Sequence, residues 1–208
     1  MTRFRPSSPQ RLVDDLADRL ATSTAQGPAL RVAIDGADAA EPLALAAAIV
    51  DPLRERGRPV TVVAAETFWR DASLRLEYGR EDVDEYLEWL DVAALRREVL
   101  DPLGPGGTGV FTPSLRDPTT NRATRAPATT AQHGAIVIVA GALLLGRGLP
   151  FDVSIHLALS PGALQRRTDP AAHWTLEAIA RYEQQANPQQ TADIVVRLDD
   201  PARPAVRG

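Results

Sequence analysis

The chain has no cysteine among its 208 residues, and its three histidines, His133, His156 and His173, are far apart in the sequence. A chain without cysteine can form neither a disulfide framework nor a thiolate metal site. Three scattered histidines also lack the close spacing that is typical of zinc ligands. The sequence therefore predicts no resident metal. Its stability has to come from a hydrophobic core, for which 44% hydrophobic residues are sufficient.

Lysine is missing as well, since all 23 basic residues are arginine. The codon usage of a GC-rich genome would account for this bias, but the chemical consequence is the same whatever its cause. No segment can supply an ammonium group for a Schiff base or for neutralising a phosphate. Any phosphate group would have to be bound by arginine side chains or by backbone amides.

Long apolar runs and a basic surplus are also absent. No run reaches the roughly 18 residues that a bilayer-spanning helix needs. The first ten residues, "MTRFRPSSPQ", lack the apolar centre of a signal peptide. A net charge of −4 argues against a general nucleic-acid binder. We therefore expect a cytoplasmic protein that binds neither membranes nor nucleic acid.

Apolar runs that alternate with helical patterns predict the fold class. Because the runs are apolar on both faces, they are typical of strands in a parallel sheet covered by helices. A first helix is expected from Ser8, as N-cap, and Pro9. The prediction is an α/β fold with a five-stranded, mostly parallel sheet in a three-layer sandwich. The expected strands are 30–34, 60–65, 135–140, 153–159 and 194–198, and the expected further helices are 43–56, 92–100 and 174–186.

A single domain over residues 1–208 is expected, because no repeat or separate second core is visible. The connection 66–134 is rich in Gly, Pro and Thr and is predicted to be a long loop or lid with one hairpin. A short lid is expected at 162–175. The tail after Leu198 is predicted to be extended and frayed.

The stretch "RVAIDGADAAEPLALAAAIV", residues 31–50, has the strand, loop and helix order of a phosphate-binding loop. In that loop the pattern G-x-x-x-x-G-K-[ST] would place Gly, Lys and a hydroxyl residue at positions 41, 42 and 43. The chain has Glu41, Pro42 and Leu43 there instead. This scaffold therefore lacks the side chains that bind phosphate and magnesium.

Several stretches over residues 30–204 together resemble the bacterial uridine kinase-like branch of the P-loop nucleoside kinases, in the phosphoribulokinase and uridine kinase group. They are "IDGADAAEPLA", "AETFWR", "YLEWLD", "LDPLGPGG", "IVAG", "QRRTD", "ARYEQQANP" and "ADIVVRL". The resemblance implies a P-loop kinase fold and, in an intact member, phosphoryl transfer from ATP with magnesium.

The resemblance also implies a nucleotide-binding loop, which is degenerate in this chain. Its positions are Gly36, Asp38, Ala39, Glu41, Pro42 and Leu43. Glu41 would place a carboxylate near the phosphates, and Pro42 removes both the lysine and an amide. Ala140 stands where the family has an aspartate. Tight ATP binding through this loop is not expected. A purely structural interpretation of Glu41 and Pro42 is a favourable helix start, with an acidic residue near the positive end of the helix dipole.

The acceptor side resembles the family more closely. Glu66 stands where the family has the general base, and Asp35 is a second candidate catalytic carboxylate. A solvated carboxylate at a strand end is an equally good interpretation of Glu66. Aromatic residues such as Trp69, Tyr78 and Trp89 could stack on a ligand or pack in the core. The remaining candidates are Phe68, Tyr86, Glu88, Asp91 and Asp117 for substrate binding and Arg166, Arg167 and Arg181 for the lid.

Three functions remain open at this stage. The first is a pseudoenzyme that binds a small polar or nucleoside-like molecule, with a protein partner as a further option. The second is an active kinase for a nucleoside or other small molecule, which alone would require ATP and magnesium. The third is acid/base chemistry of another class through Glu66, Glu41, Asp35 and Asp91. The first is preferred, with no cofactor expected, and the oligomeric state is left undetermined.

Overall fold

The computed structural model describes residues 4–208, and its centre is a seven-stranded sheet in the order β1-β9-β8-β7-β2-β6-β3. The five predicted strands are confirmed and are all parallel. They are β2 (Ala29–Asp35), β3 (Val60–Ala64), β6 (Ala135–Gly141), β7 (Val153–Ala158) and β8 (Ile194–Arg197).

The predicted strand number of five was wrong, because both ends of the chain add a short antiparallel strand at the edge. These strands are β9 (Ala205–Arg207), which pairs with β8, and β1 (Arg5–Pro6), which pairs with β9. The predicted frayed tail is therefore part of the sheet. The edge of β8, which is apolar except for Arg197, gains ladder hydrogen bonds when β9 covers it.

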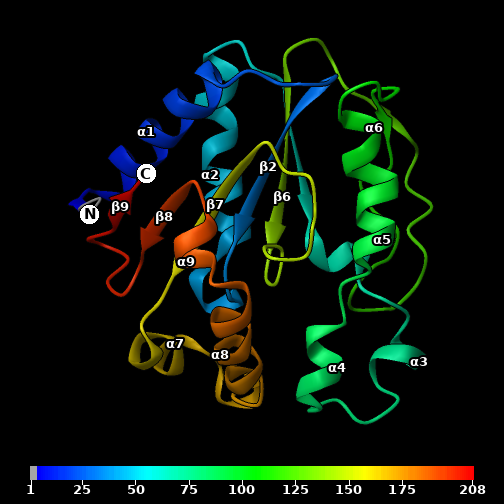
Figure 1. Cartoon of the computed structure of the whole chain (residues 1–208), viewed down its shortest axis with the longest axis vertical. Helices are drawn as coiled ribbons and strands as arrows, with labels where there is room; N and C mark the ends of the chain where they lie inside the picture. The colour runs from blue at the N-terminus through cyan, green and yellow to red at the C-terminus, as the bar shows by residue number, and fades with distance from the viewer. Residues whose placement is uncertain (1–3) are drawn as a thin grey trace.

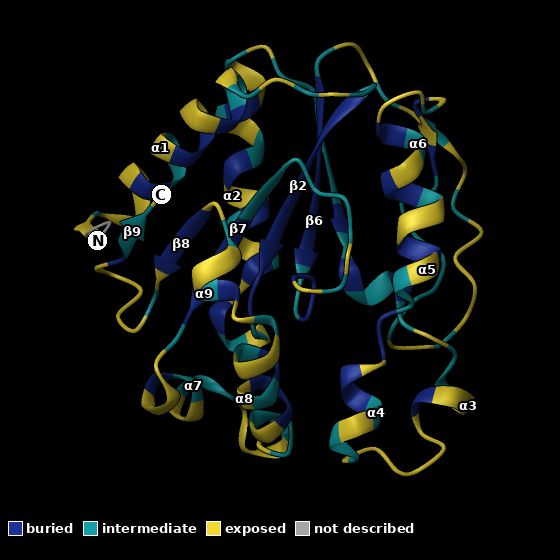
Figure 2. Ribbon diagram, in the orientation of Figure 1, coloured by how far each residue is buried: buried dark blue, intermediate teal, exposed yellow. Residues whose placement is uncertain are grey.

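Helices cover both faces of the sheet (Figure 1), which confirms the three-layer arrangement. The strand β2 alternates between the two layers: Leu30, Val32 and Ile34 belong to one core cluster, and Ala29 and Ala33 to the other. Figure 2 shows the strands buried and the outer helix surfaces exposed. On the first face lie α1 (Pro9–Thr22, capped by Ser8 as predicted) and α2 (Pro42–Glu55).

The connection 66–134 is more ordered than a loop, which corrects that expectation. The helix predicted at 92–100 is present as α5, a π-helical turn and α6 in succession, and the expected hairpin is β4 with β5. The elements are η2 (Ala65–Phe68), α3 (Ala72–Arg75), α4 (Val83–Leu87), α5 (Val92–Leu95), the π-helical turn (Arg96–Leu100), α6 (Asp101–Leu103), β4 (Val110–Phe111) and β5 (Thr129–Thr130).

The segment predicted as a short lid contains helical structure near the carboxyl edge of the sheet (Figure 1). Its elements and those that follow are α7 (Pro161–Arg167), η4 (Pro170–Ala172), α8 (Thr175–Ala186) and α9 (Pro188–Thr191). Within residues 4–208, every helix is too short or too polar to cross a bilayer.

The motif "LDPLGPGG" belongs to the scaffold at the amino ends of the strands. A Cβ on Gly104 would lie 2.7 Å from a guanidinium nitrogen of Arg31, and one on Gly107 would lie 2.2 Å from the Pro102 carbonyl oxygen. Only glycine fits such close contacts. The Arg31 side chain is buried there and forms an ion pair with Asp152, just before β7. The motif thus fixes packing at the end of the sheet opposite the carboxyl edge.

Candidate functional site

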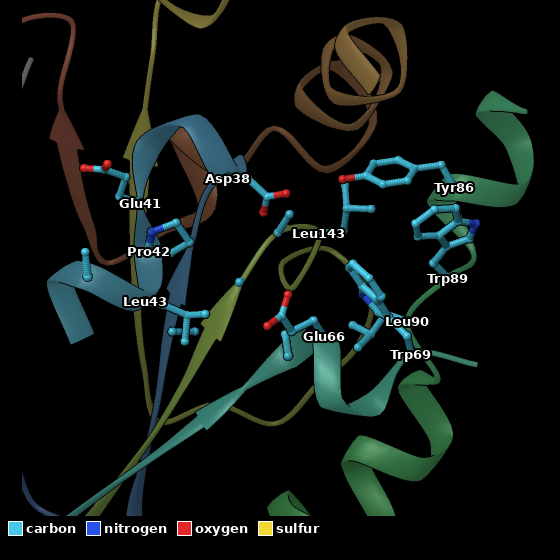
Figure 3. A pocket seen from close by; sticks show the side chains of 15 residues that line it. Asp38, Glu41, Pro42, Leu43, Glu66, Trp69, Tyr86, Trp89, Leu90 and Leu143 are labelled. Carbon is cyan, nitrogen blue, oxygen red and sulfur yellow. The ribbon is translucent and has the colours of Figure 1, made fainter. Parts of the chain in front are cut away.

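A cavity of about 330 Å³ lies at the carboxyl ends of β3 and β6, where parallel α/β sheets bind ligands (Figure 3). The loop after β2, η2 after β3, α4 and the turn after β6 all contribute to its wall. The lining residues are Asp38, Glu41, Pro42, Leu43, Ala44, Ala65, Glu66, Trp69, Tyr86, Trp89, Leu90, Ala140, Gly141, Ala142 and Leu143. Six predicted site residues are among them: Asp38, Glu41, Pro42, Leu43, Glu66 and Tyr86.

Two carboxylates, those of Asp38 and Glu66, point into the cavity (Figure 3). Burial raises the pKa of Asp38. Burial is also the main cause that raises the pKa of Glu66, and the negative charges of Asp38 and Asp117 add to it. The two groups therefore repel each other in a partly desolvated space. Such a pair favours a cation between the two carboxylates.

An aromatic wall stands opposite the loop after β2. The centroids of Trp69 and Trp89 are 5.2 Å apart, and those of Tyr86 and Trp89 are 5.0 Å apart, both edge to face. Short antiparallel pairing positions the two indoles, because the amide of Arg70 donates to the Trp89 carbonyl at 2.8 Å and Trp69 pairs with Leu90. The Trp89 indole N–H also donates to the Arg75 carbonyl at 3.1 Å. These hydrogen bonds fix the positions of the two indoles relative to each other.

The loop after β2 forms hydrogen bonds between its own backbone amides and carbonyls. Its η1 turn (Asp38–Ala40) uses the amides of Ala40 and Glu41, which donate to the carbonyls of Ala37 and Asp38 at 2.7 and 2.9 Å. Pro42 begins α2 and has no amide hydrogen. Several amides that a phosphate-binding loop directs at its ligand are therefore engaged or missing.

The helix start expected at Glu41 and Pro42 is confirmed, since α2 begins at Pro42 and Glu41 stands at its N-cap position. The Glu41 backbone is left-handed (φ 58°, ψ 53°), and its side chain makes no capping hydrogen bond. The carboxylate points away from the cavity (Figure 3) and lies 3.8 Å from a guanidinium nitrogen of Arg167. Position 41 thus has a left-handed backbone conformation that favours glycine, although glutamate occupies it.

The Glu41→Gly variant is expected to be more stable than the wild type by about 0.5–1 kcal/mol. Glycine removes the strain of the left-handed backbone, and the higher conformational entropy that it gives the unfolded chain offsets part of this gain. Urea denaturation measures the change. Glu41→Ala is the matched control, because it removes the same carboxylate and keeps the strain. If both variants were more stable than the wild type, the gain would come from removing the Glu41 carboxylate and not from relieving backbone strain.

Asp35, predicted as a catalytic carboxylate, is buried and does not line the cavity. It is 0% exposed, accepts a hydrogen bond from the Leu144 amide at 2.9 Å and lies 2.7 Å from Nδ1 of His156. Nε2 of His156 lies 3.1 Å from Glu183, at an angle unsuited to a hydrogen bond. The Tyr182 hydroxyl accepts from the Leu145 amide at 3.0 Å. This network holds the turn after β6, which forms one wall of the cavity.

Four of the predicted substrate-binding residues, Phe68, Glu88, Asp91 and Asp117, do not line the cavity. Phe68 is 1% exposed and packs in the core. Glu88 is exposed and lies outside the cavity. Asp91 caps α5 by accepting from the Ala94 amide at 2.8 Å. Asp117 accepts from two amides of its own turn, which lower its pKa. Asx caps and turns of this kind depend on local backbone shape, which a motif match alone does not reveal.

The lid arginines and the rest of the loop lie around the cavity rather than in it. Arg166 is exposed, and Arg181 forms a 2.7 Å ion pair with Asp84 of α4. Arg167 and Ala39 line a neighbouring cavity of about 440 Å³. Gly36 lies beneath the loop, where a Cβ would approach Leu157 to 2.9 Å.

Sequence reasoning missed the role of His156 and the contribution of Leu143. Asp35 and His156 are 121 positions apart, and His156 belongs to none of the motifs that carry the resemblance. Only a parallel β2–β7 register, which pairs Asp35 with His156, indicates that contact. Knowledge of the strand order would have revealed it.

No protein-family model matches the chain, and no curated protein matches it by sequence. Solved structures do match it. A possible uridine kinase from Bacillus stearothermophilus superposes with a TM-score of 0.72 at 21% identity, covering 89% of this chain and 97% of its own. A candidate fructose transport system kinase from Silicibacter sp. TM1040 gives 0.61 at 21% identity, covering 89% and 95%. The YGR205w protein gives 0.61 at 8% identity, covering 97% and 99%. The chain therefore has the fold of the P-loop kinases.

Proposed function

We propose that this chain is a small-molecule-binding protein on a P-loop kinase fold, and that it does not transfer phosphoryl groups from ATP through the loop at 36–43. The observation that carries the proposal is the sequence Glu41, Pro42 and Leu43 on a loop whose η1 turn is closed on itself. Lysine, a magnesium-binding hydroxyl and free loop amides are the usual means of holding a triphosphate.

The electrostatics of the loop support the same conclusion. Asp38 and Glu41 place two carboxyl groups on it, and the nearest basic side chain that contacts it, among residues 4–208, is Arg167 at 3.8 Å from Glu41. The Arg167 guanidinium already forms an ion pair with the Glu41 carboxylate. It also donates a hydrogen bond to the Leu198 carbonyl at 2.9 Å. A triphosphate at the loop would meet little net positive charge.

An active kinase is the second candidate, and Glu66 is the observation in its favour. Glu66 follows β3 directly, faces the loop across the cavity and has a raised pKa, as a general base for a hydroxyl acceptor would need. In this alternative Arg167 would turn from Glu41 to a bound phosphate. The two candidates differ in whether ATP binds.

Calorimetric titration with ATP, with and without magnesium, separates them. The proposal predicts no binding up to about 1 mM in either condition. Micromolar binding that requires magnesium would overturn it in favour of the kinase, and nucleotide turnover with uridine or other hydroxyl acceptors would then be measured.

Restoring the loop gives a second expected outcome. The triple variant Glu41→Gly, Pro42→Lys and Leu43→Thr should bind ATP with magnesium at least about tenfold more tightly than the wild type, because it restores a cation and a hydroxyl ligand. The matched control carries Met instead of Lys at position 42 and lacks only the charge. Equal affinities for both variants would contradict the argument from the missing lysine.

A further inference from the structure

The charged groups that line the cavity at the carboxyl ends of β3 and β6 are all of one sign. Asp38, Glu41 and Glu66 line it, and no arginine or histidine does so within the described residues 4–208. Of these three carboxylates, Asp38 and Glu66 point inward, whereas Glu41 turns away toward Arg167 (Figure 3). A phosphate or carboxylate ligand would meet like charge in a partly desolvated space, which is unfavourable.

The aromatic side chains that line the cavity also suit a cation. The rings of Trp69 and Tyr86 each meet that of Trp89 edge to face, with interplanar angles of 70° and 64°. Faces of electron-rich rings attract cations, and tryptophan does so best. The same two indoles already bind one cation: the guanidinium of Arg75, which is not among the cavity lining, lies 5.1 Å from the Trp69 centroid and 4.7 Å from that of Trp89.

The charge of Asp38 reaches the rest of the cavity. Burial is the largest cause of the raised pKa of Glu66 and of the raised pKa of the Tyr86 hydroxyl. The negative charge of Asp38 is the second cause in both cases. A positive charge between the Asp38 and Glu66 carboxylates would relieve the repulsion between them. The cavity therefore holds two carboxylates that a bound cation would stabilise.

We propose that this cavity binds a small organic cation, a protonated amine or a quaternary ammonium group, held between the Asp38 and Glu66 carboxylates and the rings of Trp69, Tyr86 and Trp89. This names the ligand class of the proposed function and rests on it, because it assigns the cavity to a ligand without phosphate. Carboxylates and aromatic rings together favour a large, weakly hydrated cation. Leu43, Leu90 and Leu143 complete an apolar lining that a strongly hydrated metal ion would not require.

The first test compares two ligands of the same shape. Choline and its neutral isostere 3,3-dimethylbutan-1-ol are titrated calorimetrically into the full chain at constant ionic strength. Choline is expected to bind at least about tenfold more tightly than the alcohol, since the two differ only in charge. Equal affinities, or tighter binding of the alcohol or of uridine, would overturn the proposal.

Variants then locate the site. Glu66→Gln and Asp38→Asn keep the side-chain shape and remove a charge, and each should weaken choline binding about tenfold or more, while Trp69→Leu should weaken it by a similar factor. Glu88→Gln is the matched control, because Glu88 is exposed and lies outside the cavity. Thermal denaturation verifies that each variant is folded. Unchanged binding in both Glu66→Gln and Asp38→Asn would overturn the proposal.

The two proposals fail separately. Magnesium-dependent ATP binding with a clear choline preference would overturn the proposed function and keep the cation site. Absence of ATP binding together with no preference for choline would overturn the cation site and keep the proposed function.

Discussion

Replacing Asp152 with alanine is expected to lower the free energy of unfolding by about 3–5 kcal/mol, because it leaves a buried guanidinium without its partner. The side chains of Arg31 and Asp152 are each 7% exposed. Their contact is bidentate, with Nε to Oδ2 at 3.0 Å and Nη2 to Oδ1 at 2.7 Å. The Asp152 carboxylate also accepts from the Arg31 amide at 2.9 Å.

The loss should be large because few other acceptors reach this arginine. Its Nη1 lies 3.4 Å from the Leu100 carbonyl, which is a long hydrogen bond. The pair also joins the amino end of β2 to the start of β7, since the Asp152 amide donates to the Arg31 carbonyl at 2.8 Å. Breaking it therefore disturbs the register of the two central strands.

Chemical denaturation measures this effect, with Asp51→Ala as the matched control. Asp51 pairs with Arg54 at 3.2 Å, but the two side chains are 84% and 59% exposed. Exposed pairs of this kind contribute less than about 1 kcal/mol. A loss of similar size in both variants would contradict the role assigned to burial of the Arg31 pair.

A loss of stability on the order of 3 kcal/mol is expected as the pH rises from 6.5 to 9, because His156 holds its proton more tightly in the folded state. Burial alone lowers the pKa of this imidazole. The carboxylates of Asp35 and Glu183 outweigh burial and raise the pKa to about 9. Since the folded pKa lies above the usual value of 6.5, the contribution is complete below pH 6.5 and disappears as the pH passes 9.

Urea denaturation of the wild type and of His156→Gln at pH 6, 7.5 and 9 tests this prediction. The variant should be the less stable protein at pH 6 and should show a much smaller decrease toward pH 9. His133→Gln is the control, because His133 is exposed. If His156→Gln kept the full pH dependence of the wild type, the assignment to this imidazole would be wrong.

The sequence alone predicted most of the scaffold, because its signals are local. Apolar runs without alternation identified the five parallel strands, and Ser8 with Pro9 identified the start of α1. The two edge strands were missed, since strands of two or three residues carry too little pattern to be recognised. Their formation depends on the exposed edge of β8.

For the site, sequence determined which side chains the loop lacks, and tertiary structure determined what the remaining residues do. Lysine is absent from the whole chain, so no fold could restore it. Asp35 and Asp38 are three positions apart, yet one anchors a buried histidine and the other enters the cavity. Burial and partners decide the role of a carboxylate, and both come from distant segments such as β7 and α4. Only the tertiary structure therefore revealed a cavity with carboxylates on one side and aromatic rings on the other.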